Sequence, residues 1–191
     1  SYLYLHRAAR NVVAAVRAVH SRGYVIGDIN ESNVMVADNA LVTLVDTDSF
    51  QVTDPHGGAV YRSPVGKPEF TPPELQGVRF SDVNRLPEHD LFGLAVLIFR
   101  FLMEGTHPFS GVYTGSGDPP SYEQNILAGH FAYGGKRPGP NRPIPIAPPM
   151  EIIDPTVREL LVRCFDDGFD NPRARPDCPT WQAALGAAED S

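Results

Sequence analysis

The segment "YVIGDINESNVMV", residues 24–36, places one acid, Asp28, between an apolar run and a polar loop. An amide, Asn33, follows it at the end of that loop, before the chain becomes apolar again. A folded protein rarely keeps a carboxylate this close to its core without a partner or a task. A second acid, Asp46, closes the next apolar run at "TLVD". These polar positions therefore direct the search for a function.

Composition excludes several classes of protein. The chain has 191 residues, of which 42% are hydrophobic, which is enough for one sizeable core. Its formal net charge is -7 and no basic patch stands out, so we expect no nucleic-acid partner. Cys164 and Cys178 have neither zinc spacing nor the density of a disulfide scaffold, which favours a reducing, cytoplasmic location. The longest apolar run, 91–103, is too short to span a bilayer, so we expect no membrane partner.

The order of predicted elements is helix, small sheet, long loop, then mostly helices, an α+β pattern that is mainly α. Apolar residues at helical spacing predict a first helix over 5–20, ended by Gly23. The apolar "YVI" predicts a short strand, and "NVMVADNALVTLVD" predicts two strands around a turn at Asp38-Asn39. A Gly-, Pro-, Ser- and Thr-rich loop follows over 46–77, and loops of that length are usually functional or disordered. Further helices are predicted over 88–104, 121–131, 155–165 (with Asp154 as N-cap) and 179–189.

The predicted hairpin brings Asp46 toward Asn33, because the two ends of a hairpin meet. A carboxylate and an amide oxygen together could hold Mg²⁺, which prefers hard oxygen ligands. The second carboxylate, Asp28, could accept a proton from a hydroxyl. Taken singly, each of the three is more often a turn or cap residue than a catalytic one. Their spacing and the flanking strands favour the functional interpretation.

Several segments of the chain resemble the motifs of one known protein family. "GDINESN" followed by "VDTDSF" is similar to the catalytic loop of protein kinases and their Asp-Phe-Gly metal motif, at the separation kinases use. "PVGKPEFTPPEL" resembles the end of an activation segment, with "PPE" in place of Ala-Pro-Glu. "HDLFGLAVLIFRFLMEGTHPF" resembles the long buried helix that begins with an acid, and "RARP" resembles the late arginine motif. The resemblance covers nearly the whole chain in the right order.

The resemblance implies a protein kinase-like C-terminal lobe over 1–191, mainly helical, with short β-hairpins that carry the catalytic and metal loops. It places the catalytic loop region at 24–37 and the activation segment at 46–77. Asp28 matches the catalytic base. Asn33 and Asp46 match the ligands of Mg²⁺ (or Mn²⁺) that bind ATP, so Asn33 belongs to both the catalytic loop and the metal site.

Three further positions match structural roles in the family. Asp90 matches the buried anchor of the catalytic-loop backbone. Glu74 and Arg175 match a structural ion pair. Breaking a buried pair of this kind typically costs about 3–5 kcal/mol.

Several positions depart from the family's pattern. Ile26-Gly27 replace the usual His-Arg, so a phosphorylated activation segment would lack its usual cationic partner. We therefore expect that phosphorylation of Thr53, Ser63 or Thr71 is not the activating switch. Asn30 replaces the lysine that helps neutralise the moving phosphoryl group, which implies slower transfer.

"DTD" replaces Asp-Phe-Gly, so Thr47 stands where the family has a phenylalanine and Asp48 where it has glycine. Asp48 either touches the metal or caps a turn, and the turn is the favoured reading.

The sequence contains neither the glycine-rich phosphate loop nor the strand lysine of a kinase N-terminal lobe. We expect that lobe to be missing from this chain and the chain alone to be a poor enzyme. Its loss should expose apolar surface near Tyr2, Leu3, Tyr24 and Val34 and cause the fragment to self-associate.

Three functions remain open at this stage. The first is a bacterial-type Ser/Thr protein kinase acting on ATP and a protein substrate. The second is a small-molecule phosphotransferase of the kinase-like superfamily, since aminoglycoside and choline kinases also use a Gly-Asp loop, which Gly27-Asp28 resembles. The third is a pseudokinase, a scaffold or nucleotide sensor. The departures from the pattern favour a pseudokinase, whereas the intact Asp28, Asn33 and Asp46 argue against it.

Overall fold

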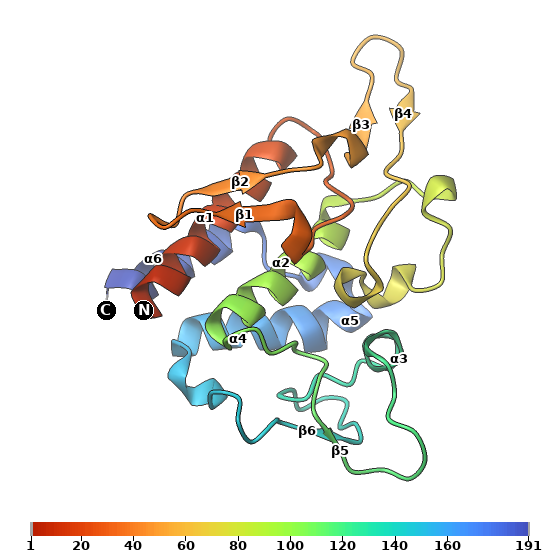
Figure 1. Ribbon diagram of the computed structural model, residues 1–191. Coiled ribbons are helices and arrows are strands. Elements are labelled where there is room, and N and C mark those ends of the chain that lie inside the picture. The colour runs from red at the N-terminus through yellow and green to blue at the C-terminus, as the bar shows by residue number, and fades with distance from the viewer. Residues whose placement is uncertain (1, 191) are drawn as a thin grey trace.

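The computed structural model describes residues 2–190, which form helices surrounded by short two-stranded antiparallel sheets (Figure 1). The α-helices are α1 (Tyr2–His20), α2 (Pro87–Leu102), α3 (Tyr122–Leu127), α4 (Pro155–Val162), α5 (Gly168–Asp170) and α6 (Cys178–Asp190). The strands are β1 (Val34–Val36), β2 (Val42–Leu44), β3 (Val52–Thr53), β4 (Val60–Tyr61), β5 (Val112–Tyr113) and β6 (Asn141–Arg142). The architecture agrees with the predicted mainly helical α+β class. Within residues 2–190, no helix has the length and apolar character needed to cross a membrane.

Helix α2 is the centre of the core. Pro87 occupies its first turn, where a missing N–H costs nothing, and apolar residues then cover the helix on all sides. A helix that is apolar all round must be buried, and α2 is buried from Asp90 to Phe99. Aromatic rings pack beside it, with Phe92 5.6 Å from Phe165 between ring centroids.

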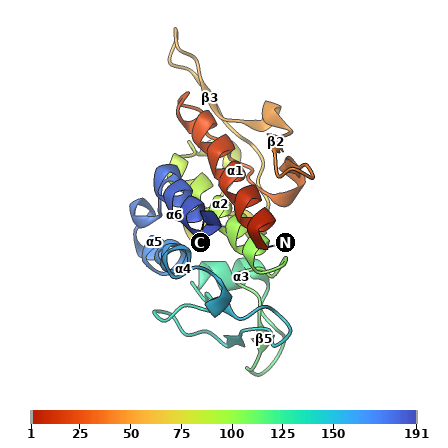
Figure 2. The same cartoon turned by 90° about the vertical axis from the view of Figure 1, so that its left-hand side faces the viewer.

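Helix α1 lies between α2 and α6 because its apolar residues recur on one face. Ala8, Ala9, Val12, Val13 and Val16 are completely buried there. Figure 2 shows α1 and α6 side by side, with the two ends of the chain close together. The helix ends at His20 as predicted and begins at Tyr2, before the predicted start at residue 5.

The first hairpin has the predicted form, with Val34 opposite Leu44 and Val36 opposite Val42. The predicted strand over 24–26 is wrong, because Val25 makes only an isolated bridge to Gln51. Residues 24–26 have no neighbouring strand along their length, so they cannot form the further backbone hydrogen bonds of a β-ladder.

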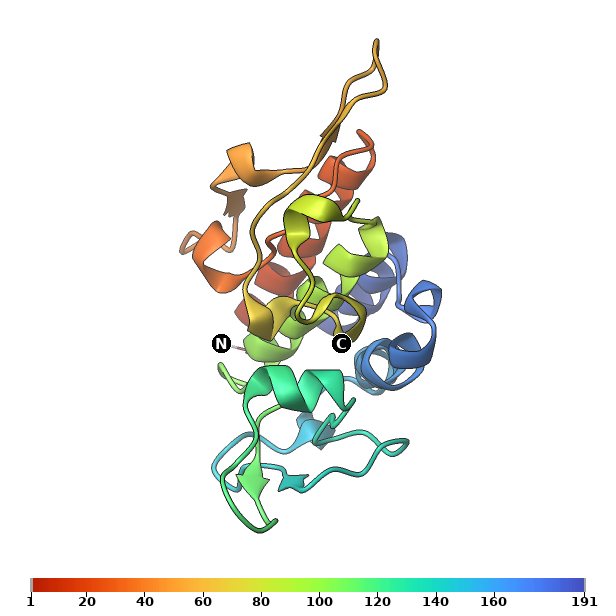
Figure 3. The ribbon, with the colours of Figure 1, turned by 90° about the vertical axis from the view of Figure 1, so that its right-hand side faces the viewer.

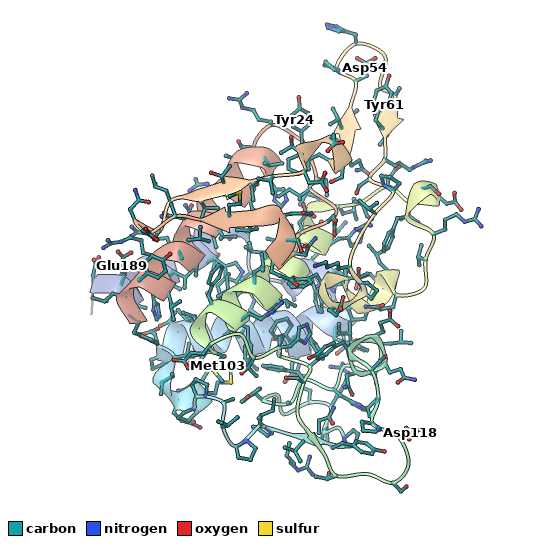
Figure 4. The ribbon with its side chains drawn as sticks, in the orientation of Figure 1. Tyr24, Asp54, Tyr61, Met103, Asp118 and Glu189 are labelled. Carbon is teal, nitrogen blue, oxygen red and sulfur yellow. The ribbon has the colours of Figure 1, made fainter. Side chains whose placement is uncertain are left out.

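The segment 46–77 contains structure that the sequence analysis missed. Strands β3 and β4 pair within it, with Val52 opposite Tyr61, and the resulting hairpin projects from the body of the molecule (Figure 3). Asp54 and Tyr61 lie on this projection (Figure 4), and Tyr61 is exposed. The rest of the segment returns to the core through short single-turn helices.

The remaining helices agree with the sequence only in part. Asp154 caps α4 as predicted, since its Oδ1 accepts hydrogen bonds from the N–H groups of Thr156 and Val157 at 2.8 and 3.2 Å. The predicted helix over 155–165 changes to a wider turn over Arg163–Asp167. Helix α3 is shorter than predicted. Strands β5 and β6 pair on either side of it, which period-2 patterning could not reveal in two-residue strands.

Candidate active site

The carboxylate of Asp28 is held by donors from two separate segments of the chain. Its Oδ1 accepts from the side-chain amide of Asn30 at 2.9 Å and from the backbone N–H of Lys67 at 3.2 Å. Its Oδ2 accepts from Nδ2 of Asn33 at 3.1 Å. A half-buried carboxylate with three donors keeps one orientation and still has lone pairs for a further donor.

Asn30 and Asn33 shape the loop around this acid. Asn30 is buried, and its Oδ1 accepts from the N–H of Ser32 at 2.9 Å, which caps the turn Glu31–Asn33. The Nδ2 groups of both asparagines also donate to the backbone oxygen of Asp28, at 3.1 and 3.0 Å. The amide nitrogen of Asn33 is therefore occupied by Asp28, and its oxygen is the atom that could face a cation.

The hairpin brings Asp46 to the same region. The N–H of Val45 donates to the backbone oxygen of Asn33 at 3.0 Å, so Asp46 begins one residue beyond that link. Asp46 has φ 58° and ψ 41°, in the left-handed region that few non-glycine residues adopt. The hydroxyl of Ser49 donates to its carbonyl at 2.9 Å and supports the turn. Backbone strain of this kind is concentrated at functional sites.

Asp46 and Asp48 form an exposed acidic pair. A hydrogen bond and the negative charge of Asp48 raise the pKa of Asp46, and burial and the charge of Asp28 add to this shift. Asp48 lies in the turn Thr47–Ser49, and its carboxyl group interacts with that of Asp46, so its role stays a prediction. The negative charges of Asp48 and Asp28 thus both act on Asp46, and a bound cation would relieve this repulsion.

Residues Asn33 and Asp46 fit a cation that arrives with a nucleotide better than a metal held by protein alone. Residues 2–190 contain no group of three or more His, Cys, Asp or Glu side chains placed to hold a metal ion. Mg²⁺ in phosphoryl-transfer sites takes only one or two protein oxygens and obtains the rest from phosphates and water. One carboxylate and one amide oxygen match that requirement.

Asp90 anchors the backbone that leads into Asp28. At the start of α2, its two carboxylate oxygens accept from the N–H groups of Ile26 and Gly27, both at 2.8 Å. His20 Nε2 also lies 2.8 Å from Oδ2 of Asp90, so the end of α1 joins the same acid. The predicted contact between Asp90 and the catalytic-loop backbone is present.

Glu74 and Arg175 also lie together as predicted. Arg175 Nη1 and Nη2 donate to the two carboxylate oxygens of Glu74 at 2.7 and 2.8 Å. Nη1 and Nη2 of Arg175 also donate to the carbonyls of Glu88 and Gly168, respectively, both at 2.9 Å. This pair ties the end of segment 46–77 to the helical core.

Lys67 was not among the candidate residues identified from the sequence. Besides its backbone bond to Asp28, its ammonium group donates to Ser32 Oγ at 2.7 Å and to Glu31 Oε1 at 3.2 Å. Arg100 lies 3.4 Å from the other oxygen of Glu31. A cation thus lies at the loop in which Asn30 stands where the family has lysine, but it comes from a distant segment, and no local sequence pattern indicates this contact.

Residues 4–179 match the sequence pattern of the protein kinase domain. The chain belongs to the protein kinase domain family. Two proteins named Protein kinase YegI, from Escherichia coli O157:H7 and from Escherichia coli strain K12, are each 36% identical to it over 185 residues, which is 95% of this chain and 28% of the relative. The ovarian-specific serine/threonine-protein kinase Lok of Drosophila melanogaster is 32% identical over 123 residues, 63% of this chain and 24% of the relative. The chain therefore spans less than a third of the length of these curated relatives.

Membership of the kinase domain family agrees with the resemblance first suggested by "GDINESN" and "VDTDSF". The helical core with small antiparallel sheets is compatible with that family. The individual roles of Asp28, Asn33 and Asp46 remain predictions, and their geometry is the basis for the proposal below.

Proposed function

We propose that this chain is the C-terminal lobe of a protein kinase that transfers the γ-phosphoryl group of ATP to serine or threonine hydroxyls of a protein substrate. The observation that carries the proposal is the fixed carboxylate of Asp28, held by Asn30, Asn33 and the backbone of Lys67. The fold gives this acid one orientation before any substrate binds, and preorganisation of that kind lowers the barrier to reaction.

In this proposal Asp28 accepts the hydrogen bond of the acceptor hydroxyl and takes its proton as the hydroxyl oxygen bonds to the γ-phosphorus. The bond from that phosphorus to the bridging oxygen breaks, and ADP leaves. Asn33 holds Asp28 through its amide nitrogen. Its amide oxygen and the carboxylate of Asp46 would hold the cation. When bound, Mg²⁺ or Mn²⁺ neutralises the charge on the transferring phosphates. The raised pKa of Asp46 supports this assignment, because a cation would relieve the repulsion between the neighbouring acids Asp46 and Asp48.

The nucleotide cleft requires further elements. We infer that a glycine-rich loop and a strand lysine are supplied by an N-terminal lobe outside these 191 residues, and that the chain alone transfers phosphate poorly. Several large apolar side chains are exposed: those of Tyr2, Leu3, Tyr24, Met35 and Leu41. Their exposure supports the proposal that another lobe covers part of the surface that they form. Val34, by contrast, is half-buried against the core, so the expected exposure does not extend to it.

The experiment uses the full gene product that carries this chain, incubated with Mg-ATP labelled at the γ-phosphate and a mixed protein substrate. We expect label on serine or threonine, identified by phosphoamino-acid analysis. Asp28→Asn should reduce transfer by about 10²–10⁴-fold while Mg-ATP binding persists, since the proton acceptor is lost but the ligands remain. Label on tyrosine would replace the serine/threonine assignment, and undiminished transfer in the variant would remove Asp28 from the base's role.

A small-molecule phosphotransferase remains the second candidate, because Gly27-Asp28 resembles the Gly-Asp loop of kinases that act on small molecules. The ion pair of Glu74 with Arg175 and the Asp90 anchor favour the protein kinase. A pseudokinase is the third candidate. Mg-ATP binding without transfer to any protein would favour these two alternatives over the first.

A further inference from the structure

A buried arginine joins the catalytic loop to segment 46–77 through backbone atoms. Arg85 lies in the loop before α2 and is only 3% exposed. Its Nη1 donates to the carbonyl of Gly27 at 2.8 Å, and its Nη2 donates to the carbonyl of Val65 at 2.9 Å. One rigid, planar group thus links the residue before Asp28 to a residue two positions before Lys67.

The backbone of Arg85 is fixed on its other side by Gln51. The Gln51 side chain accepts from the N–H of Arg85 at 2.7 Å and donates to its carbonyl at 2.9 Å. The Gln51 backbone exchanges two hydrogen bonds with Val25, at 3.1 and 2.8 Å. The guanidinium also lies 3.9 Å from the centre of the Phe80 ring. Both the backbone and the side chain of Arg85 are therefore held by neighbouring residues.

The glycine before Asp28 makes this close approach possible. Gly27 has φ +77°, and a Cβ atom there would lie 2.4 Å from Oγ of Ser63, which is completely buried. Gly66 is similarly crowded, because its Cβ would lie 2.8 Å from the Phe80 ring and 3.2 Å from Nη2 of Arg85. The arginine that kinases usually carry at position 27 could not fit here. A guanidinium from another element lies against the carbonyl of that residue instead.

Burial of this charge is costly, which indicates a specific role. Burial lowers the pKa of Arg85, although the charges of Asp90 and Asp28 oppose the shift. The Nε atom of Arg85 is buried and has no hydrogen-bond partner among residues 2–190. A buried guanidinium usually faces a carboxylate or a phosphate, and the two groups that face Arg85 most closely are neutral carbonyls.

We propose that Arg85 is a positioning residue that holds the activation segment against the catalytic loop without any phosphate. The inference rests on the proposed catalytic role of Asp28. Phosphate-dependent segments become ordered when an arginine meets a new charge, so their order can be switched. Arg85 bonds to backbone carbonyls, which carry no switchable group. The N–H of Lys67 consequently stays at Asp28 in the unmodified protein.

The test compares Arg85→Met, Arg85→Lys and the control Arg79→Met in the full gene product. Arg79 lies in the same loop, but its side chain is 81% exposed. Two quantities are measured: hydrogen exchange of the amides in 60–70, and kcat and KM for phosphoryl transfer by protein shown by mass to be unphosphorylated. For Arg85→Met we expect faster exchange confined to 60–70 and a fall in kcat of about 10–100-fold with little change in the KM for ATP.

Arg85→Lys should lie between the wild type and Arg85→Met, because an ammonium keeps the charge but lacks the planar fork, and Arg79→Met should match the wild type. If Arg85→Met fails to fold, Arg85→Lys decides the matter. Wild-type exchange and kcat in the folded Arg85 variants would overturn the inference, as would a wild-type enzyme that needs phosphorylation to order 60–70. The exchange readout does not depend on transfer, so failure of the proposed function would appear as an inactive wild type with the exchange difference intact.

Discussion

Glu74 and Arg175 lie 101 positions apart in the chain and meet as a two-point ion pair, with N–O distances of 2.7 and 2.8 Å. The Arg175 side chain is fully buried, whereas that of Glu74 is 29% exposed. The pair therefore closes segment 46–77 onto the last part of the core, and each partner satisfies a charge that has little access to water.

We expect Glu74→Gln to destabilise the protein by about 3–5 kcal/mol, because it leaves the buried guanidinium of Arg175 without its counter-charge. The Glu74→Gln/Arg175→Met double variant should lose less stability than the sum of the two single variants, by about 1–3 kcal/mol. Urea unfolding of the four proteins measures this coupling. Arg79→Met breaks the exposed contact with Asp82 and should cost at most about 0.5 kcal/mol. Additive losses at Glu74 and Arg175 would contradict the assignment.

Gly27→Ala should destabilise the protein more than Gly23→Ala, although both glycines have similar backbone angles. Their φ values are +77° and +75°, so both variants carry the strain of a left-handed residue, about 1–2 kcal/mol. Only at Gly27 does the new Cβ overlap another residue, Ser63, while nothing lies within 4 Å at Gly23. The overlap should add about 1–3 kcal/mol. Equal losses of unfolding free energy would show that Ser63 does not pack against Gly27.

His107 should make stability fall in mildly acidic solution. Burial lowers its pKa from 6.5 to about 4, although a hydrogen bond to the carbonyl of Glu69 opposes the shift. Its Nε2 lies 2.9 Å from that carbonyl, and its Nδ1 accepts from the N–H of Phe109 at 3.2 Å. The contact with Phe109 requires the neutral ring, since a proton on Nδ1 would face another donor, whereas Nε2 donates to Glu69 in either protonation state.

Between pH 6.5 and about 4 the unfolded chain binds a proton at His107 that the folded chain does not. Stability therefore decreases as the pH falls through this window, by about 3 kcal/mol from this group at pH 4. Urea unfolding at several pH values measures the loss. His107→Gln, which can make both hydrogen bonds without titrating, should lack this component. Parallel pH curves for the two proteins would mean that His107 does not titrate as described.

Phosphorylation of the activation segment should not switch the enzyme on. Ser63 is completely buried, Thr71 is 4% exposed and its hydroxyl donates to the carbonyl of Lys67 at 2.8 Å. Substitutions of Ser63 or Thr71 would disturb the packing of the core as well as remove a hydroxyl. Thr53 is exposed, so its substitution tests phosphorylation alone. Thr53→Ala and phosphatase-treated wild type should both transfer phosphate at about the wild-type rate. A large loss of activity in either would show that a phosphate at this hairpin controls the enzyme.

Much of this protein can be predicted from local sequence. The acid, amide and second acid at Asp28, Asn33 and Asp46 have fixed spacing, and their loop and hairpin form from neighbouring residues. The helices α1 and α2 follow from apolar periodicity, and α4 from its Asp154 cap, because these signals act within one or two turns. The short strands β3, β4, β5 and β6 could not be predicted, since two-residue ladders depend on a partner rather than on a pattern of their own.

The sequence by itself determined the family and the order of the motifs, and it marked Asp28 as the candidate acid, because these depend on residue type and spacing. Only the tertiary structure decided which residues hold that acid. Lys67 reaches Asp28 through a backbone N–H, and Arg85 reaches Gly27 and Val65 through carbonyls, atoms that every residue shares and that carry no sequence signal. Such contacts exist only once packing around α2 has brought distant segments together, so the fold alone specifies them.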